Sequence, residues 1–216
     1  MPTTAPTPAA ERRAAVREAI LAATRDVVAV NGFREVQMTV VAQRAGVSVG
    51  VIYKHFPSRA DLLAEVYVRA VTHEVDLVRE AVAGASGASR QIAAAVDTFC
   101  RRALQAGRFG HALLTEPTDP AVDEHRLEFR ENYRALFARL IEDGIDAGEL
   151  PRQDADIASA AVLGIMTETL VRPLSAAKRR RNPDPLVPGI VSHCLAAVGA
   201  RALAPASRSP RRPRRA

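Results

Sequence analysis

Apolar residues recur along most of this chain at the three- and four-residue spacing of an α-helix. The first run, whose members are separated by four, three, four and three positions, consists of Val16, Ile20, Ala23, Val27 and Val30. Because this spacing places all five side chains on one face, it predicts a helix over about 12–30. The Asn-Gly pair at 31–32 is typical of a helix end, since glycine accepts the left-handed backbone conformation.

The same periodicity predicts eight further helices, separated by glycine and proline residues. They are expected at about 38–45, 48–56, 58–82, 89–106, 109–114, 121–147, 154–172 and 186–202. Tryptophan is absent and aromatic residues make up only 4% of the chain, a composition that favours helices over β-strands. Since no pair of segments has the alternation of neighbouring strands, the sequence predicts an all-α fold.

Three short helices precede residue 60 and six follow it, which predicts two helical domains. The first, 11–60, has the plan of a helix-turn-helix DNA-binding domain, and the second, 61–202, is large enough for its own core. Residues 1–10 are predicted to be a disordered leader, because they lack the basic start and apolar centre of a signal peptide. Residues 203–216, rich in arginine and proline, are predicted to be a basic disordered tail.

Charge is distributed unevenly along the chain, which has a net formal charge of +6. Residues 1–60 carry a net charge of +4, residues 61–200 carry −4 and residues 201–216 carry +6. A basic first domain indicates a polyanionic partner for that domain. The basic run Lys178–Arg181 is predicted to be a solvated loop. The tail is predicted to be a solvated segment with no specific role, and the alternative is that it adds non-specific affinity for DNA.

The turn between the second and third predicted helices has the features of a helix-turn-helix. Ala45 is small enough for close helix packing, Gly46 permits the tight turn, and Val47 fills the space between the helices. Ser48 is expected to cap the third helix with its hydroxyl. The first helix would brace the pair, leaving the third helix to read DNA.

One face of the third helix is apolar and is expected to pack inward, which leaves the other face for DNA. That second face consists of Val49, Gly50, Tyr53, Lys54 and His55. Gly50 lets a phosphate or a base edge approach the backbone, while Tyr53 and His55 can donate hydrogen bonds to phosphate oxygens. Lys54 supplies positive charge, and Val49 can touch a thymine methyl group.

The motif around this turn is similar to the signature of the TetR/AcrR family of transcriptional regulators. The similarity is dense over residues 32–63 and includes Gly32-Phe33, the run Val41–Phe56, Arg59 and the pair Leu62-Leu63. Chain length, the nine-helix plan and the N-terminal position of the motif agree with the family as well. Downstream, the resemblance rests on architecture and on phrases such as Gly148–Pro151.

The resemblance implies roles for particular residues at the DNA. It places Ser48, Val49, Gly50, Tyr53 and His55 at or near DNA, and it implies that Arg59, where the family usually has lysine, contacts a phosphate. The family usually caps its second helix with a threonine whose hydroxyl often meets a phosphate, but this chain has Gln37 at that position. Either the Gln37 amide substitutes for that contact, or Thr39 takes the role.

The resemblance also implies that the 61–202 domain binds a small molecule and forms a homodimer. Its last two helices have small apolar faces that suit pairing with a second copy, unless they are buried inside one monomer. Those faces are Ala158, Ala161, Leu163, Gly164, Ile190, Val191, Cys194, Leu195 and Val198. The middle helices are expected to enclose a pocket, although each candidate could equally be simple core. The candidates are Phe99, Leu104, Phe109, His111, Leu114, Phe129, Tyr133, Phe137 and Met166.

The sequence offers no pattern of catalytic or metal-ligating residues. Its histidines are isolated from one another, and it has neither a nucleophile elbow nor a phosphate-binding glycine loop. No enzyme activity, metal or cofactor is therefore predicted, and Cys100 and Cys194 are expected to be buried free thiols. Since no apolar run approaches the roughly 18 residues of a membrane span, a cytoplasmic protein without membrane contact is predicted.

Together these patterns predict a dimeric repressor that binds a near-palindromic, double-stranded DNA operator. An apolar or amphipathic effector in the second domain would release it. An activator, or a regulator without an effector, would have the same sequence pattern. Two alternatives belong to other classes of protein. One is a helical enzyme or acyl carrier with a vestigial helix-turn-helix, and the other is a nucleoid-packaging protein that uses the arginine-rich tail.

Overall fold

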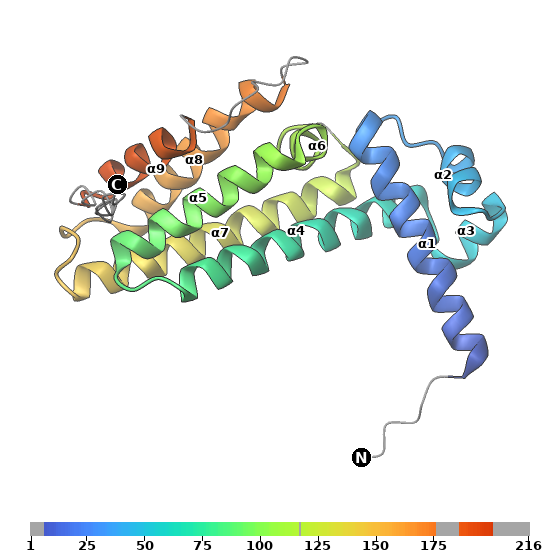
Figure 1. Ribbon diagram of the computed structural model, residues 1–216, viewed down its shortest axis with the longest axis horizontal. Helices are drawn as coiled ribbons and strands as arrows, with labels where there is room; N and C mark the ends of the chain where they lie inside the picture. Colours follow the sequence, from blue (N-terminus) through green and yellow to red (C-terminus); the bar gives the residue numbers. More distant parts are fainter. Residues whose placement is uncertain (1–6, 117, 176–185, 201–216) are drawn as a thin grey trace, which may run out of the picture.

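The computed structural model describes residues 7–116, 118–175 and 186–200, and these residues form nine α-helices and no β-strand (Figure 1). The helices are α1 (Pro8–Asn31), α2 (Met38–Ala45), α3 (Val49–His55), α4 (Arg59–Ala83), α5 (Ala88–Ala106), α6 (Arg108–Leu114), α7 (Pro120–Asp146), α8 (Ala155–Ser175) and α9 (Leu186–Ala197). The all-α fold predicted from the sequence is confirmed.

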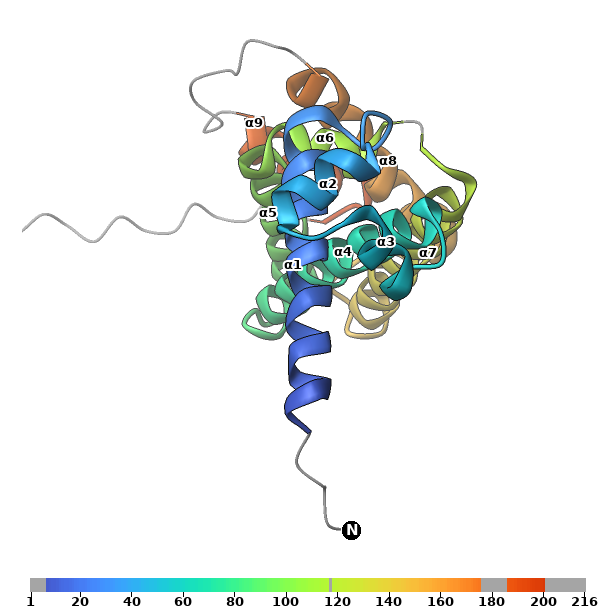
Figure 2. The ribbon, with the colours of Figure 1, turned by 90° about the vertical axis from the view of Figure 1, so that its right-hand side faces the viewer.

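The first three helices form one end of an elongated molecule, and the other six form a bundle beside them. In Figure 1, α4, α5 and α7 run along the bundle while α8 and α9 lie on one side of it. α4 contacts both α5 and α7, and α9 contacts α5 and α8. Figure 2 shows α1, α2 and α3 in front of the bundle. This arrangement agrees with the predicted three-helix and six-helix parts.

α1 begins earlier than the periodicity indicated. The Thr7 hydroxyl accepts a hydrogen bond from the Ala10 N–H at 3.3 Å, and Pro8 suits the first turn because its missing N–H would have no partner there. The predicted disordered leader is therefore wrong for residues 8–10, which are helical. The remainder of that leader (residues 1–6), the basic loop Lys178–Arg181 and the tail 203–216 lie outside the described residues.

One continuous hydrophobic core joins the two parts of the molecule. The largest fully buried side chains include Phe33, just after α1, Phe56, just after α3, and Phe137 in α7. The ring of Phe33 lies 6.3 Å from that of Tyr67 in α4, so the first part packs directly on the bundle. Because packed interiors transmit strain, a shift of the bundle helices affects the helices beside them.

α8 contains a longer apolar stretch than was predicted from the sequence. By length and composition it could cross a membrane, contrary to the expectation that no such run exists. In this structure α8 packs against α5, α6, α7 and α9. Only 39% of its apolar stretch is buried inside the monomer, so the helix presents an apolar surface.

Most of the face predicted for dimerisation is core of the monomer. The buried members, which cannot supply an interface, are Ala158, Leu163, Ile190, Cys194, Leu195 and Val198. They are buried because α8 and α9 pack against each other and against the bundle. The small or apolar residues that stay open on the first half of α8 are Ile157, Ala160, Ala161 and Gly164, and Ile157 is 71% exposed.

Candidate DNA interface and ligand cavity

The predicted helix-turn-helix lies at the end of the molecule opposite α9 (Figure 1). Gly46 joins α2 to α3 with φ of 69°, a left-handed conformation that favours glycine. As predicted, the Ser48 hydroxyl oxygen caps α3 by accepting a hydrogen bond from the Val51 N–H at 3.3 Å. Ile52 is fully buried and anchors α3 against the other helices.

The residues predicted to meet DNA are mostly exposed on α2, α3 and the segments that precede them. The exposed residues are Gln37, Thr39, Ser48, Gly50, Tyr53 and Lys54, whereas Val49 and His55 are half-buried. Tyr53 is 48% exposed although its ring is large and apolar. An exposed aromatic ring with a hydroxyl at its tip suits a contact with a phosphate oxygen.

The start of α2 distinguishes the two alternatives for its cap. Gln37 occupies the capping position, but its side chain makes no capping hydrogen bond. Thr39 lies inside the first turn of the helix and is not the cap. Both side chains are exposed, and contact of either one with DNA stays a prediction.

Arg59 joins the loop after α1 to the bundle. Its guanidinium donates to the carbonyl oxygens of Phe33 at 2.8 Å and Val36 at 3.0 Å, and it pairs with Asp119 at 3.4 Å. These acceptors engage most of the guanidinium N–H groups with which Arg59 could bind a phosphate. The structure therefore favours a structural role for Arg59 over the phosphate contact expected from the resemblance.

We expect Arg59→Gln to lower the free energy of unfolding by about 1–3 kcal/mol, because several hydrogen bonds to buried carbonyls are lost. The dependence of operator affinity on salt should not change. The matched variant Lys54→Gln should do the reverse, leaving stability unchanged and reducing the slope of log affinity against log salt by about 1. Denaturant unfolding and fluorescence anisotropy measure the two effects. A smaller salt slope for Arg59→Gln would instead show that Arg59 contacts a phosphate of the operator.

A shallow groove beside α3 includes two arginines that the sequence reading missed. Arg12 and Arg13 of α1 line it together with Val51, Lys54 and His55. The groove gathers several hydrogen-bond donors and positive charges at one edge of α3, which suits the phosphate backbone. Periodicity placed the two arginines at the start of a helix, but it could not show that α1 runs past α3.

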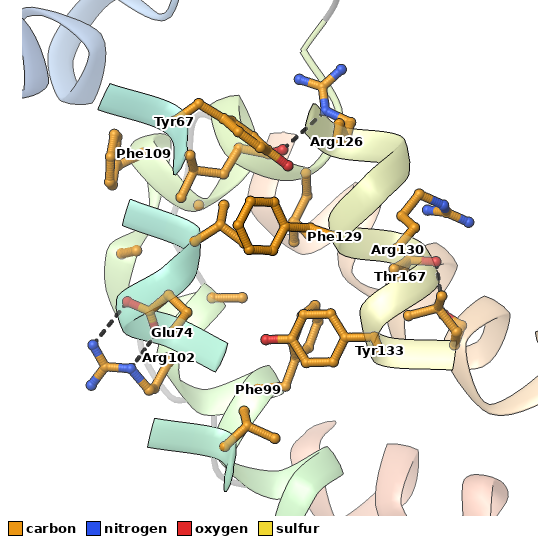
Figure 3. A pocket seen from close by; sticks show the side chains of 18 residues that line it. Tyr67, Glu74, Phe99, Arg102, Phe109, Arg126, Phe129, Arg130, Tyr133 and Thr167 are labelled. Atoms are coloured by element: carbon orange, nitrogen blue, oxygen red, sulfur yellow. Dashed lines mark hydrogen bonds and ion pairs between the residues drawn. The ribbon is translucent and has the colours of Figure 1, made fainter. Parts of the chain in front are cut away.

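A cavity that is partly open to solvent lies between α4, α5, α6, α7 and α8 (Figure 3). Its walls are mostly apolar, which suits a ligand with an apolar body. Five of the predicted lining residues are in the wall: Phe99, Phe109, Leu114, Phe129 and Tyr133. The sequence reading missed the contribution of α4, which consists of Tyr67, Val71, Glu74 and Val78.

Four predicted lining residues do not line this cavity. Phe137 and Met166 are fully buried in the core. Leu104 packs against the core, and the Nδ1 atom of His111 lies 3.1 Å from the guanidinium of Arg108. Periodicity shows which side of a helix faces the interior, but it does not show which part of the interior is hollow.

Most polar groups in the cavity wall are bonded to other protein groups. Arg102 donates to Glu74 at 2.9 Å, and the Thr167 hydroxyl donates to a carbonyl of its own helix at 2.9 Å. Burial raises the pKa of Tyr67 to about 12 despite the nearby charge of Arg126, so this phenol is neutral at ordinary pH. Arg102, Glu74 and Thr167 therefore have most of their hydrogen bonds within the protein.

Arg126 connects the cavity to the first part of the chain. Its guanidinium donates to the Leu113 carbonyl of α6 at 3.2 Å and to the Glu116 carbonyl at 2.9 Å. The Glu116 carboxylate accepts a hydrogen bond from the Phe33 N–H at 3.1 Å and pairs with Arg108 at 3.0 Å. Glu116 therefore links Arg126 in the cavity wall to the backbone of Phe33, just after α1.

Gly32 makes room for this contact. It ends α1 with φ of 85°, and a Cβ atom there would collide with the side chains of Arg108 and Glu116. Any larger residue at this position would displace the two side chains that form this ion pair.

Both cysteines are buried and free, as predicted. Burial raises the pKa of the Cys100 and Cys194 thiols to about 12, so both stay protonated and unreactive at neutral pH. Among the described residues, no group of histidine, cysteine and acidic side chains is arranged to hold a metal ion.

Two sequence models of known families match this chain. Residues 20–66 match the bacterial regulatory proteins of the tetR family, and residues 85–170 match the tetracyclin repressor-like C-terminal domain. The chain belongs to the TetR family. It is a DNA-binding transcriptional regulator and not an enzyme, and the helix-turn-helix at α2 and α3 is its DNA-binding element.

Known transcriptional regulators resemble the chain over most of its length or over part of it. The fatty acid metabolism regulator protein of Bacillus subtilis is 24% identical, over 70% of this chain and 79% of that protein. The transcriptional repressor KstR of Mycobacterium tuberculosis is 41% identical over 32% of each chain. The structure of the B. subtilis regulator FadR in complex with stearoyl-CoA superposes with a TM-score of 0.73 at 18% identity, covering 84% of this chain and 98% of that one.

Regulators of the TetR family bind operator DNA as dimers and respond to small-molecule effectors. The exposed face of α3 and the apolar cavity are where such a regulator needs its two sites.

Proposed function

We propose that this protein is a cytoplasmic repressor that binds a near-palindromic operator as a homodimer and releases it when an amphipathic acyl ligand enters the cavity. The observation that carries this proposal is the chain of contacts from the cavity wall through Arg126 and Glu116 to the end of α1. A ligand shifts the balance between two conformations only by binding one of them better. A ligand that can bind only when Arg126 moves would favour a conformation in which the DNA-binding helices α1–α3 are placed differently.

An acyl chain with an anionic head fits the chemistry of the cavity. Phenylalanine rings from α5, α6 and α7 supply apolar walls. Arg130 of α7 is exposed at the cavity and makes no hydrogen bond or ion pair within the described residues, so its charge is available to a head group. The relative solved with stearoyl-CoA supports this ligand class.

The dimer would place its two α3 helices in successive major grooves, about 34–36 Å apart. Tyr53, Lys54 and His55 would position the helix on phosphates, while Val49 and DNA shape would contribute the choice of sequence. Footprinting on the DNA upstream of the gene should reveal a protected near-palindrome of two half-sites. If no duplex is retained specifically at moderate salt, the proposed operator binding is wrong.

Repression and activation give opposite results in a reporter strain. With the operator placed before a reporter gene, deletion of this protein should raise transcription. A fall in transcription on deletion would make the protein an activator with the same fold.

The open apolar face of α8 is the proposed dimer contact. Ile157→Glu should weaken the dimer about 100-fold, because symmetry buries two new carboxylates in one apolar interface. The matched control is Leu127→Glu on α7, where Leu127 is 69% exposed and lies outside the α8 face. Sedimentation equilibrium measures both variants. An Ile157→Glu protein that stays as dimeric as the wild type would exclude this face.

A further inference from the structure

Tyr133 carries a buried polar atom in the cavity wall that has no protein partner among the described residues. Its side chain is 6% exposed, and its hydroxyl is buried without a hydrogen bond. Figure 3 shows the Tyr133 ring reaching from α7 into the cavity, with the hydroxyl directed toward the side where Glu74 and Arg102 lie. The hydroxyl therefore has no protein acceptor for its proton among the described residues.

The orientation of Tyr133 is fixed by packing. Its ring meets Phe99 edge to face, with centroids 5.3 Å apart and planes at 83°. The Glu74 carboxylate accepts hydrogen bonds from Arg102 on both of its oxygens and makes none with the Tyr133 hydroxyl. Burial and the charge of Glu74 raise the pKa of Tyr133, which keeps the phenol protonated and able to donate.

A donor held in an apolar cavity without an acceptor costs free energy, and a ligand that supplies the acceptor removes that cost. A saturated hydrocarbon cannot do so. Sites that hold a buried hydrogen-bonding group consequently discriminate strongly against ligands that leave the group unpaired.

We propose that Tyr133 donates a hydrogen bond to a carbonyl oxygen of the bound ligand and so selects oxygen-bearing apolar molecules over plain hydrocarbons of the same size. This inference rests on the proposed function only in that the cavity binds a small molecule. The oxygen could belong to the carbonyl of an acyl head group or to a keto group along the chain, since both offer the same acceptor.

The test compares the binding of decanones, with the ketone at carbon 2, 3 or 5, and of n-decane to the full-length protein without DNA. Displacement of a fluorescent apolar dye reports each affinity. Tyr133→Phe should weaken the best decanone about tenfold and leave n-decane within about twofold, because only the ketone loses a hydrogen bond. The empty variant should melt no more than about 2 °C below the wild type, since it loses no protein contact.

The control is Tyr67→Phe, a second buried tyrosine of the wall whose hydroxyl interacts with Arg126. It should leave the ratio of decanone to decane affinity unchanged. An unchanged ratio in Tyr133→Phe, a larger fall in its melting temperature, or a wild type that binds neither probe would each overturn the inference.

Stearoyl-CoA and its S-octadecyl thioether, which lacks the carbonyl oxygen, identify the source of the acceptor. If Tyr133→Phe weakens the binding of stearoyl-CoA but not of the thioether, the partner of Tyr133 is the head-group carbonyl. If it weakens the binding of the decanone but not of stearoyl-CoA, the partner is a keto group on the chain. Failure of stearoyl-CoA to release the operator contradicts the proposed function alone, because the decanone ratio is measured independently of DNA.

Discussion

Replacing Tyr53 and His55 together with alanine should lower operator affinity about 100-fold while the fold stays intact. Each side chain is expected to donate one hydrogen bond to a charged phosphate oxygen, worth about 1.5 kcal/mol, and two such losses correspond to about 100-fold. Tyr53 is 48% exposed, and His55 is half-buried at the shallow groove beside α3, so little packing is lost. Fluorescence anisotropy with a labelled operator at fixed salt measures the effect.

The control for this pair is His193→Ala, an exposed histidine on α9 at the other end of the molecule. It should bind the operator as the wild type does. If the double variant also binds normally, the DNA is held elsewhere. Equal affinity for operator and unrelated duplexes would favour the packaging hypothesis, in which the arginine-rich tail carries the binding.

Glu116→Ala should destabilise the protein by about 2–3 kcal/mol and should reduce the effect of ligand on operator binding. The substitution leaves the Phe33 N–H without its acceptor and removes the ion pair of Arg108, which keeps its contacts with Asn31 and His111. It also breaks the connection between Arg126 and the end of α1. Thermal unfolding should show a fall of about 5–10 °C.

Glu124→Ala provides the comparison, because Glu124 is exposed on α7 and makes no hydrogen bond or ion pair within the described residues. It should change neither stability nor ligand response. Glu116→Gln separates the two roles of Glu116: it keeps an acceptor for the Phe33 N–H but removes the charge that pairs with Arg108. A Glu116→Ala protein with full stability and a full ligand response would show that this contact does not join the two sites.

Local features of the fold were predictable because their causes lie within a few residues. Ser48 caps a helix that begins at the next residue, and Gly32 and Gly46 adopt the positive φ that their turns need. The spacing of apolar residues gave the helices and their order for the same reason. The error at the start of α1 is also local, since Thr7 and Pro8 carry a capping signal ahead of the first apolar residue.

Features that join distant segments were not predictable from the sequence. Glu116 bonds to Phe33, 83 residues away, and Arg59 bonds to the same residue across 26 positions. No local signal marks such partners. Phe137 and Tyr133 occupy the same face of α7, yet only Tyr133 lines the cavity. The difference depends on how five helices meet, which periodicity along one helix does not contain.

The most direct measurement is a titration of stearoyl-CoA into the complex of the dimer with a labelled operator, followed by anisotropy. We predict that the wild type releases the operator as the ligand saturates the cavity, and that Glu116→Ala, with ligand affinity unchanged, releases it at least about tenfold less readily. An operator complex that persists unchanged when the ligand is shown to occupy the cavity would contradict the proposed coupling between the two sites.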